Sequence, residues 1–373
     1  MRKVVSFVIC LILFSGCKTR TDLVTVIDFG TLRNMSVSEL FSGIEMIPLE
    51  TTDESLLGWI DHIEFYEDKI YVFQSNVGSG VFVFSKDGKF LSKLSRQGRG
   101  PGEYIFPMAF TIDQRGAALI LDANLVRLLK YNITDFSFIQ EVPLPVTHNP
   151  PISVAIDEGN DRYYFFKGIN LQIPDANYHF IISDEQGNIL TEEVTKPYYG
   201  FSYGGHSLFH KFEGKTYGTI HYSNEVFEFS GDNIELKYKL QFGEYSFPDE
   251  DLFIKYQNYN GKREFYSEID GDLSKWIKYM QVSQSEKYLV AGYRSVNEHY
   301  LGIFDKGTKK SINVRLSDLK DDLGLGFSLP YPMVNKGDYF VGWLDATRTN
   351  NMIEGVENDS NPVLVFYKFK KIE

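Results

Sequence analysis

One short loop carries residue types that could bind a ligand. Residues 96–104 read Arg-Gln-Gly-Arg-Gly-Pro-Gly-Glu-Tyr. Guanidinium groups bind anionic or carbohydrate ligands through paired hydrogen bonds, and a tyrosine ring can stack on a sugar. We therefore predict ligand contacts at Arg96, Gln97, Arg99, Glu103 and Tyr104. The alternative is structural: the glycines and proline specify a fixed path, along which the charged side chains pair or cap backbone groups.

A second loop is rich in tyrosine and glycine. Residues 198–206 read Tyr-Tyr-Gly-Phe-Ser-Tyr-Gly-Gly-His. Tyrosines in such a loop can stack on sugar rings while their hydroxyl groups bind the ring substituents. Tyr198, Tyr199 and Tyr203 are therefore further candidates for ligand binding. The alternative is that they cover the end of a sheet.

The motifs of common catalytic and metal sites are missing from the sequence. It contains no Gly-x-Ser-x-Gly elbow, phosphate-binding loop or dinucleotide fingerprint. His206 and His210 are four residues apart, but the residues between them predict a strand, whereas zinc motifs place such a pair on a helix. We therefore expect no catalytic residues, no metal and no cofactor.

Composition and charge exclude several classes of protein. Hydrophobic residues make up 43% and charged residues 24% of the 373 residues, which is the balance of a folded chain. The formal net charge is −12, and so acidic a chain lacks the positive field that attracts phosphate backbones. We therefore exclude nucleic acid as a partner. A glycan, a peptide or another protein is the better expectation.

The chain begins with a segment typical of exported proteins. Arg2 and Lys3 precede an apolar stretch, residues 4–14, that is too short to span a bilayer as a helix. We predict a signal peptide over residues 1–16. No acidic residue lies in this segment, so its removal would change the net charge from −12 to −14.

The end of this segment, Phe-Ser-Gly-Cys at residues 14–17, resembles the lipobox of bacterial lipoproteins. The resemblance implies that Cys17 is acylated and that residues 17–43 form a lipid-anchored tether and lead-in. The alternative is an ordinary secretory signal with a chance cysteine. No acidic cluster follows Cys17, so we expect a periplasm-facing protein anchored to the outer membrane, with the cell surface as the other location.

The elements that must position these residues are strands. Aromatic residues make up 15% of the chain, and their side chains favour pleated sheets. An apolar run followed by a polar turn and a second short run recurs, 47 to 75 residues apart, at Phe84, Tyr131, Ile182, Phe229, Phe304 and Phe366. Repeats of this length with four short strands indicate a β-propeller. We predict six four-stranded antiparallel blades over residues 44–373.

Two details of the propeller follow from the spacing. The last outer strand comes either from residues 369–372 or from the chain start at residues 44–49. The predicted inner strands offer Asp61, Glu64, Ser153, His210 and Tyr279, without the repeated acids or amides that a calcium-dependent propeller hydrolase needs. These inner strands are residues 59–65, 107–112, 151–156, 207–212, 276–282 and 330–334.

The stretch from Val83 to Leu91 and the loop from Leu94 to Tyr104 together resemble a signature of six-bladed β-propeller lipoproteins of Gram-negative bacteria, similar to NHL and TolB-type propellers. This resemblance implies the fold and an envelope location. We therefore expect a lipoprotein whose propeller face binds a ligand or protein partner without catalysis. The alternatives are a propeller hydrolase or lyase acting on a glycan or lactone, and a scaffold in an outer-membrane complex.

Overall fold

Strands dominate the computed structural model and assemble into six sheets within the residues that it describes. These residues are 24–75, 78–144, 150–157, 159–167, 178–195, 208–256, 261–271, 275–295, 298–349 and 352–373. Each sheet is one blade, and the strands of a blade are given below from the inside outward.

The first three blades each take four consecutive strands of the chain. Blade 1 comprises β3 (His62–Tyr66), β4 (Lys69–Gln74), β5 (Gly80–Ser85) and β6 (Phe90–Leu94). Blade 2 comprises β7 (Pro107–Asp113), β8 (Ala117–Asp122), β9 (Arg127–Asn132) and β10 (Phe138–Pro143). Blade 3 comprises β11 (Pro151–Asp157), β12 (Arg162–Lys167), β13 (Tyr178–Asp184) and β14 (Ile189–Thr195).

Two of the remaining blades take a strand from the chain start. Blade 4 comprises β15 (Phe209–Phe212), β16 (Lys215–Thr219), β17 (Glu225–Ser230), β18 (Asn233–Gln241) and β1 (Thr25–Asp28). Blade 5 comprises β19 (Ile277–Gln284), β20 (Tyr288–Ser295), β21 (Glu298–Asp305) and β22 (Ser311–Arg315). Blade 6 comprises β23 (Val334–Lys336), β24 (Tyr339–Leu344), β25 (Val363–Phe369) and β2 (Phe41–Pro48).

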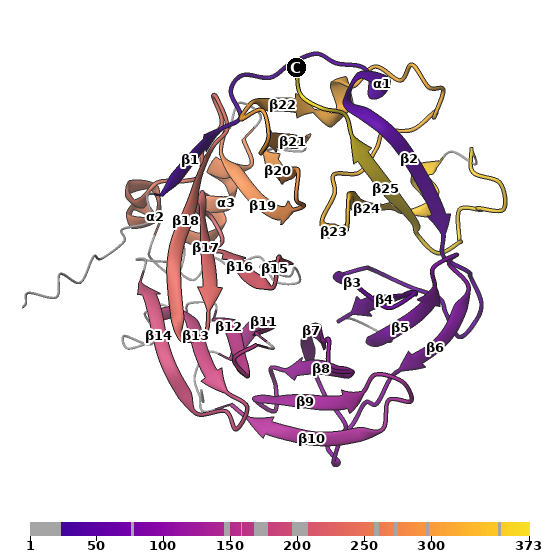
Figure 1. Cartoon of the computed structure of the whole chain (residues 1–373), viewed down its shortest axis with the longest axis vertical. Coiled ribbons are helices and arrows are strands. Elements are labelled where there is room, and N and C mark those ends of the chain that lie inside the picture. The colour runs from indigo at the N-terminus through magenta and orange to yellow at the C-terminus, as the bar shows by residue number, and fades with distance from the viewer. Residues whose placement is uncertain are drawn as a thin grey trace, which may run out of the picture.

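The six blades stand in a closed ring around a central axis (Figure 1). The inner strands β3, β7, β11, β15, β19 and β23 each contact the next around the ring, and β23 contacts β3. Each of the six repeated positions recognised in the sequence lies on the third strand of its blade. The predicted all-β, six-bladed propeller is therefore confirmed.

The predicted inner strands overlap the observed ones in five blades, with bounds that differ by up to three residues. In the sixth, the range 330–334 meets β23 only at Val334. Pro330 and Pro332 precede the strand, and a proline cannot donate to a strand ladder because it lacks an N–H group. Residues 330–333 form a loop instead.

From each blade to the next, the chain crosses at one face of the ring. In a blade of four antiparallel strands, the first strand begins and the fourth ends at the same edge. The chain therefore leaves each outer strand and enters the next inner strand at this edge, which we call the crossover face. The links between second and third strands lie there too.

Burial on both faces explains the apolar middle strands. In β4 and β5 nearly every side chain is buried, whereas in the outer strand β6 only Leu94 is buried and Leu91 is exposed. A middle strand is covered by neighbouring blades on both sides and consequently needs apolar residues at successive positions. The outer strand touches solvent, so its pattern is mixed.

The turn at Asp87 and Gly88 joins β5 to β6 and is also a contact between blades. Gly88 has a φ of 81°, which glycine adopts without steric cost. A Cβ atom there would lie 2.2 Å from the carbonyl oxygen of Pro48 in blade 6. Both the local turn and the close approach of the adjacent blade therefore require glycine.

The ring is closed by the start of the chain. β2 pairs antiparallel with β25, from Phe41 opposite Phe369 to Pro48 opposite Val363. Of the two predicted sources for the last outer strand, the chain start is therefore the one used, and Phe369 ends β25. Residues 25–28 and 41–43, assigned from sequence to the lead-in before the propeller, lie in β1 and β2.

Residues 25–48, here called the N-terminal strap, run along the outer edges of blades 4, 5 and 6. β1 pairs in parallel with β18, and the N–H of Arg33 donates to the carbonyl of Asn313 in blade 5. A Cβ atom on Gly302 of blade 5 would lie 2.7 Å from the Phe29 ring. Glycine at 302 thus leaves room for the Phe29 side chain to pack against blade 5.

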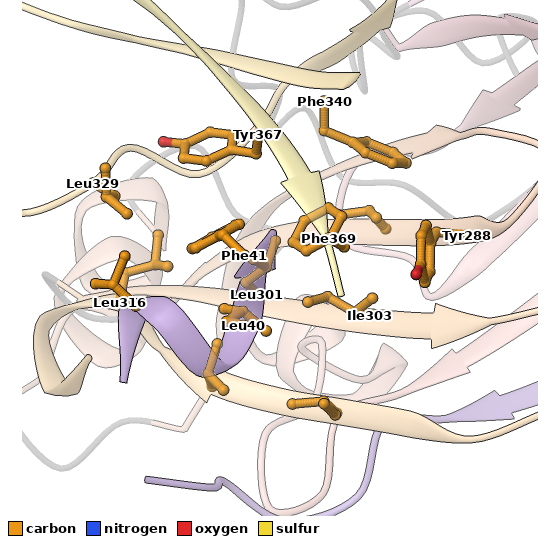
Figure 2. Close-up of a cluster of buried hydrophobic side chains, with 14 of the residues drawn as sticks. Leu40, Phe41, Tyr288, Leu301, Ile303, Leu316, Leu329, Phe340, Tyr367 and Phe369 are labelled. Atoms are coloured by element: carbon orange, nitrogen blue, oxygen red, sulfur yellow. The ribbon is translucent and has the colours of Figure 1, made fainter. Parts of the chain in front are cut away.

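A hydrophobic cluster between blades 5 and 6 secures this closure (Figure 2). It includes Leu40 from helix α1 (Val37–Leu40) and Phe41 from β2. The Phe41 ring stacks on Tyr367, with 4.9 Å between centroids, and lies 5.3 Å from Phe369. A capping box between Ser36 and Glu39 begins the helix and fixes the direction in which the strap enters the cluster.

The segment between blades 4 and 5 contains two short helices. Asp249 accepts a hydrogen bond from the N–H of Leu252 and caps α2 (Glu250–Lys255), and α3 (Gly261–Ile269) follows. Short 3-10 turns lie at Leu316–Asp318 and Ala346–Thr349. Among the described residues, no helix is long and apolar enough to cross a membrane.

Removing the Phe41 ring tests how much the strap stabilises the ring. We expect Phe41→Ala to lower the free energy of unfolding by about 3–5 kcal/mol, because the variant leaves a cavity between β2 and β25. Leu91→Ala is the control, since Leu91 is 50% exposed on an outer strand. Urea unfolding of both variants would measure the effect, and equal stabilities would contradict the role given to the strap.

Candidate functional site

A cavity of about 600 Å³ opens on the crossover face between blades 5 and 6 and reaches blade 1. We call it the blade 5–6 cavity. Its lining residues lie at the start of β19, the end of β20, the start of β21 and beside β23 and β24, which are the strand ends at this face. Four of them are large aromatic residues, namely Trp59, Tyr279, Tyr331 and Trp343. Trp59 is 51% exposed, so its ring is available to a ligand.

Blade 5 presents a row of three side chains to this cavity. Tyr279 on β19 lies opposite Arg294 on β20, which lies opposite His299 on β21. Residues opposite one another on adjacent strands point to the same side of the sheet. The strand register therefore brings a phenol, a guanidinium and an imidazole together from positions far apart in the sequence.

Tyr331 connects this row to blade 6. Its ring stacks on His299 with 4.8 Å between centroids and lies 6.4 Å from Tyr279. A Cβ atom on Gly292 would lie 2.5 Å from the Tyr331 ring, and one on Gly342 would lie 2.6 Å from its carbonyl oxygen. The two glycines thus leave the space in which Tyr331 is wedged between the blades.

The charges of the cavity are only partly neutralised. Lys278 forms an ion pair with Asp270 at the end of α3. In contrast, Arg294 and Arg348 are exposed, and within the described part of the chain neither guanidinium group has a hydrogen bond or ion pair with another side chain. Asp345 lines the same cavity, but no ion pair joins it to either arginine.

Two titratable rings in the cavity are neutral near pH 7. Burial lowers the pKa of His299 to about 4, and the positive charges of Arg294 and Arg348 act in the same direction. Burial raises the pKa of Tyr331 to about 12. The neutral imidazole and phenol can therefore exchange hydrogen bonds with an uncharged polar ligand group. Nδ1 of His299 is buried and has no hydrogen-bond partner among the described residues.

Two further cavities of about 590 Å³ each are poorer candidates. The first lies beside β1 and α2, and its lining contains one carboxylate, Asp28, and no cation. The second lies beside the strap and residues 316–329 and shares Leu329 and Arg348 with the blade 5–6 cavity. Neither lining includes a tryptophan.

The central channel contains a polar network that links three blades. Glu64 on β3 accepts a hydrogen bond of 3.0 Å from the N–H of Ile112 on β7. Lys211 on β15 donates to the carbonyl of the same Ile112 over 3.1 Å. Burial raises the pKa of Glu64, but the hydrogen bond from His62 and the charges of His62 and Lys211 outweigh it, so this pKa lies below its ordinary value.

The other inner-strand candidates also have structural contacts. Oδ2 of Asp61 accepts hydrogen bonds from the backbone N–H and the hydroxyl group of Ser75. The Nε2 atoms of His210 and Gln284 lie 3.0 Å apart, and burial lowers the pKa of His210 to about 3. Ser153 is buried. Among the described residues, no group of three His, Cys, Asp or Glu side chains is placed to hold a metal ion.

The loop first singled out in the sequence joins β6 to β7 at the crossover face. Tyr104 is fully buried and its hydroxyl group lies 3.3 Å from the carbonyl oxygens of Ser79 and Leu94, so its ring is not free to stack on a ligand. Glu103 accepts a hydrogen bond from the N–H of Gly100. These two side chains therefore hold the loop in its path.

Of the three other predicted contacts in this loop, one has a side-chain hydrogen bond to a neighbouring segment and two are exposed. Gln97 donates to the hydroxyl group of Ser79 over 2.9 Å, whereas Arg96 and Arg99 are exposed. None of the five predicted contacts in this loop lines the blade 5–6 cavity. Tyr198, Tyr199, Tyr203 and Cys17 lie outside the described residues.

Comparison with known proteins agrees with this architecture. The DUF5128 family, described as a 6-bladed beta-propeller, matches residues 16–343. The chain belongs to this family. A comparison with curated proteins found no match.

A solved structure shows the same fold as this DUF5128 propeller. A protein of Bacteroides fragilis NCTC 9343, described provisionally as exported, is 23% identical, with a TM-score of 0.80 over 93% of this chain and 100% of that chain. Virginiamycin B lyase from Staphylococcus aureus is 11% identical, with a TM-score of 0.41 over 81% of this chain and 80% of that chain. So low a score supports no inference about lyase chemistry.

Sequence reasoning about this DUF5128 propeller missed most of the cavity. It named Tyr279 as an inner-strand residue but not Trp59, Trp343, Arg294 or Arg348. These residues belong to three blades, and no local motif connects them. The one local hint was the Pro-Tyr-Pro stretch at residues 330–332, where an expected inner strand could not begin.

Two substitutions in the 96–104 loop test which of its side chains stabilise the fold. We expect Tyr104→Ala to lower the free energy of unfolding by about 3–5 kcal/mol, because a fully buried ring is lost. Arg99→Ala should change it by less than about 0.5 kcal/mol, because Arg99 is exposed. Urea denaturation would measure both, and an unchanged stability of Tyr104→Ala would contradict the anchoring role.

Proposed function

We propose that this protein is a cell-envelope lipoprotein that binds a glycan in the blade 5–6 cavity without catalysing a reaction. The observation that carries the proposal is the set of four aromatic side chains lining a cavity of about 600 Å³. Aromatic faces pack against sugar rings, while the hydroxyl and imidazole groups beside them bind the ring substituents. The volume lies within the range of about 300–1,000 Å³ typical of ligand pockets.

The direction of β1 supports an orientation on the membrane. β1 runs parallel to β18, so Asp28 lies beside Gln241 near the crossover face and the chain enters β1 at Thr25 from the opposite face. An acylated Cys17 would precede Thr25 by eight residues, a span of at most about 30 Å even when fully extended. The membrane would then lie beneath the opposite face, and the cavity would open away from it.

The envelope location has two further supports. The Bacteroides fragilis protein of the same fold is described provisionally as exported. The absence of an acidic cluster after Cys17 favours the periplasmic side of the outer membrane over the cell surface. Lipid anchoring would make the membrane a partner through Cys17 alone, without a membrane-spanning helix.

Labelling with an alkyne-tagged fatty acid tests the anchor. We expect the wild-type protein to take up the label and to sediment with outer membranes, because acyl chains hold it there. Cys17→Ala should lose the label, while Cys10→Ala is the matched control because Cys10 lies in the predicted signal peptide. Unlabelled wild-type protein in the soluble fraction would contradict lipidation.

An exposed tryptophan in the cavity provides the test of glycan binding. The full chain, extracted in detergent, is applied to a glycan array, and the dissociation constant for the strongest hit is measured by calorimetry. We expect Trp59→Ala to weaken binding about tenfold, because a stacked ring contributes about 1 kcal/mol beyond its buried area. Phe106→Ala is the control, since Phe106 is 48% exposed and lies outside the cavity lining.

Two results would count against the proposal. If the wild-type protein binds no glycan, or binds one with an affinity that Trp59→Ala leaves unchanged, the cavity is not a glycan site. If the bound glycan is cleaved during incubation, the non-catalytic part fails and the protein is a propeller hydrolase or lyase.

A further inference from the structure

We propose that the blade 5–6 cavity selects acidic glycans, with Arg294 and Arg348 together binding the carboxylate or sulfate group of one sugar residue. This inference rests on the proposed glycan binding and adds the chemical class of the ligand. The aromatic side chains would cover the ring of that sugar, and the two guanidinium groups would hold its charged substituent.

The balance of charge in the cavity differs from that of the whole chain. Its lining contains three cationic side chains, Lys278, Arg294 and Arg348, and two carboxylates, Asp270 and Asp345. The chain as a whole has a formal net charge of −12. The cavity lining therefore has a net positive charge although the protein is acidic, and this local positive charge attracts an anion.

The two arginines are the cations without a counterion. Lys278 is paired with Asp270, so its charge is already neutralised. Asp345 is exposed and forms no ion pair with Arg294 or Arg348 in the described chain. Both guanidinium groups therefore keep the donors with which arginine binds a planar anion by two parallel hydrogen bonds.

The two arginines line the same cavity from different blades. Arg294 belongs to β20 of blade 5 and lies opposite His299, whereas Arg348 belongs to the 3-10 turn after β24 of blade 6. Both positive charges act on the imidazole of His299 and disfavour its protonation. Two like charges at one cavity repel each other, and an anion bound there would relieve the repulsion.

The groups around the arginines suit a sugar better than a free inorganic anion. His299 and Tyr331 are stacked and neutral near pH 7, so they offer hydrogen bonds without further positive charge. Trp59 and Trp343 supply apolar area that a phosphate or sulfate ion could not use. A ring that carries an acidic group would use both parts of the lining.

Matched pairs of glycans test the inference on the full-length protein. The first pair is an oligogalacturonate and its methyl ester, which differ in the charge of the carboxyl group and in the added methyl group. The second pair is a sulfated galactan oligosaccharide and its desulfated form. We expect the wild-type protein to bind the charged member of at least one pair about tenfold more tightly or better, and the preference to shrink at high salt.

Two arginine variants assign the preference to the cavity. Arg294→Gln and Arg348→Gln should each weaken binding of the charged member about tenfold or more and leave the uncharged member unaffected. Arg263→Gln on α3 is the matched control, because Arg263 is exposed and lies outside the cavity lining. Melting temperatures of all three variants should match the wild type, since these arginines are exposed.

The outcomes separate this inference from the proposal on which it rests. If both members of each pair bind equally, or if the arginine variants bind the charged member like the wild type, the acidic preference is wrong and glycan binding stands. If no member of any pair binds and the array is also empty, glycan binding itself fails. A preference for the carboxylated pair identifies a uronate ligand, and a preference for the sulfated pair identifies a sulfated one.

Discussion

The pairing of β2 with β25 is the constraint on which the rest of the molecule depends. Without β2, the last blade of the ring would have only three strands. It would expose the unpaired edge of β25 and one apolar face. The chain start supplies the missing strand of blade 6 and joins the two ends of the sequence. The strap also covers the outer edges of blades 4 and 5, so a single segment of residues 25–48 joins three neighbouring blades.

Closure at the rim is complemented by contacts at the axis. The inner strands touch in sequence around the ring, and Glu64 and Lys211 bind the N–H and the carbonyl group of one residue of blade 2, Ile112. Because both charged side chains are partly buried, they need these partners. These contacts lie beside a cavity of about 170 Å³ on the inner strands, and the larger aromatic cavity lies between blades 5 and 6.

The blade 5–6 cavity depends on the same geometry. Tyr331 fits between the blades only because Gly292 and Gly342 lack side chains, and its ring then supports His299 and the neighbouring Arg294. Residues 330–333 form a loop where the sequence predicted a strand, and Tyr331 of this loop lines the cavity. Arg294 and Arg348 line the same cavity, and neither forms an ion pair with another described residue.

The sequence alone determined the strands, the turn at Asp87 and Gly88, and the number of blades, because a strand and its turn are encoded by neighbouring residues and the pattern recurs six times. It left open which segment closes the ring, and it predicted ligand contacts at residues 96–104 without showing that Tyr104 and Glu103 hold this loop in its path. Only the tertiary structure decided which segment closes the ring and which residues line the cavity. The closing strand pairs Phe41 with Phe369, and Trp59 and Arg348 line the same cavity. Strand register and blade packing bring these distant residues together, and neither has a local signature in the sequence.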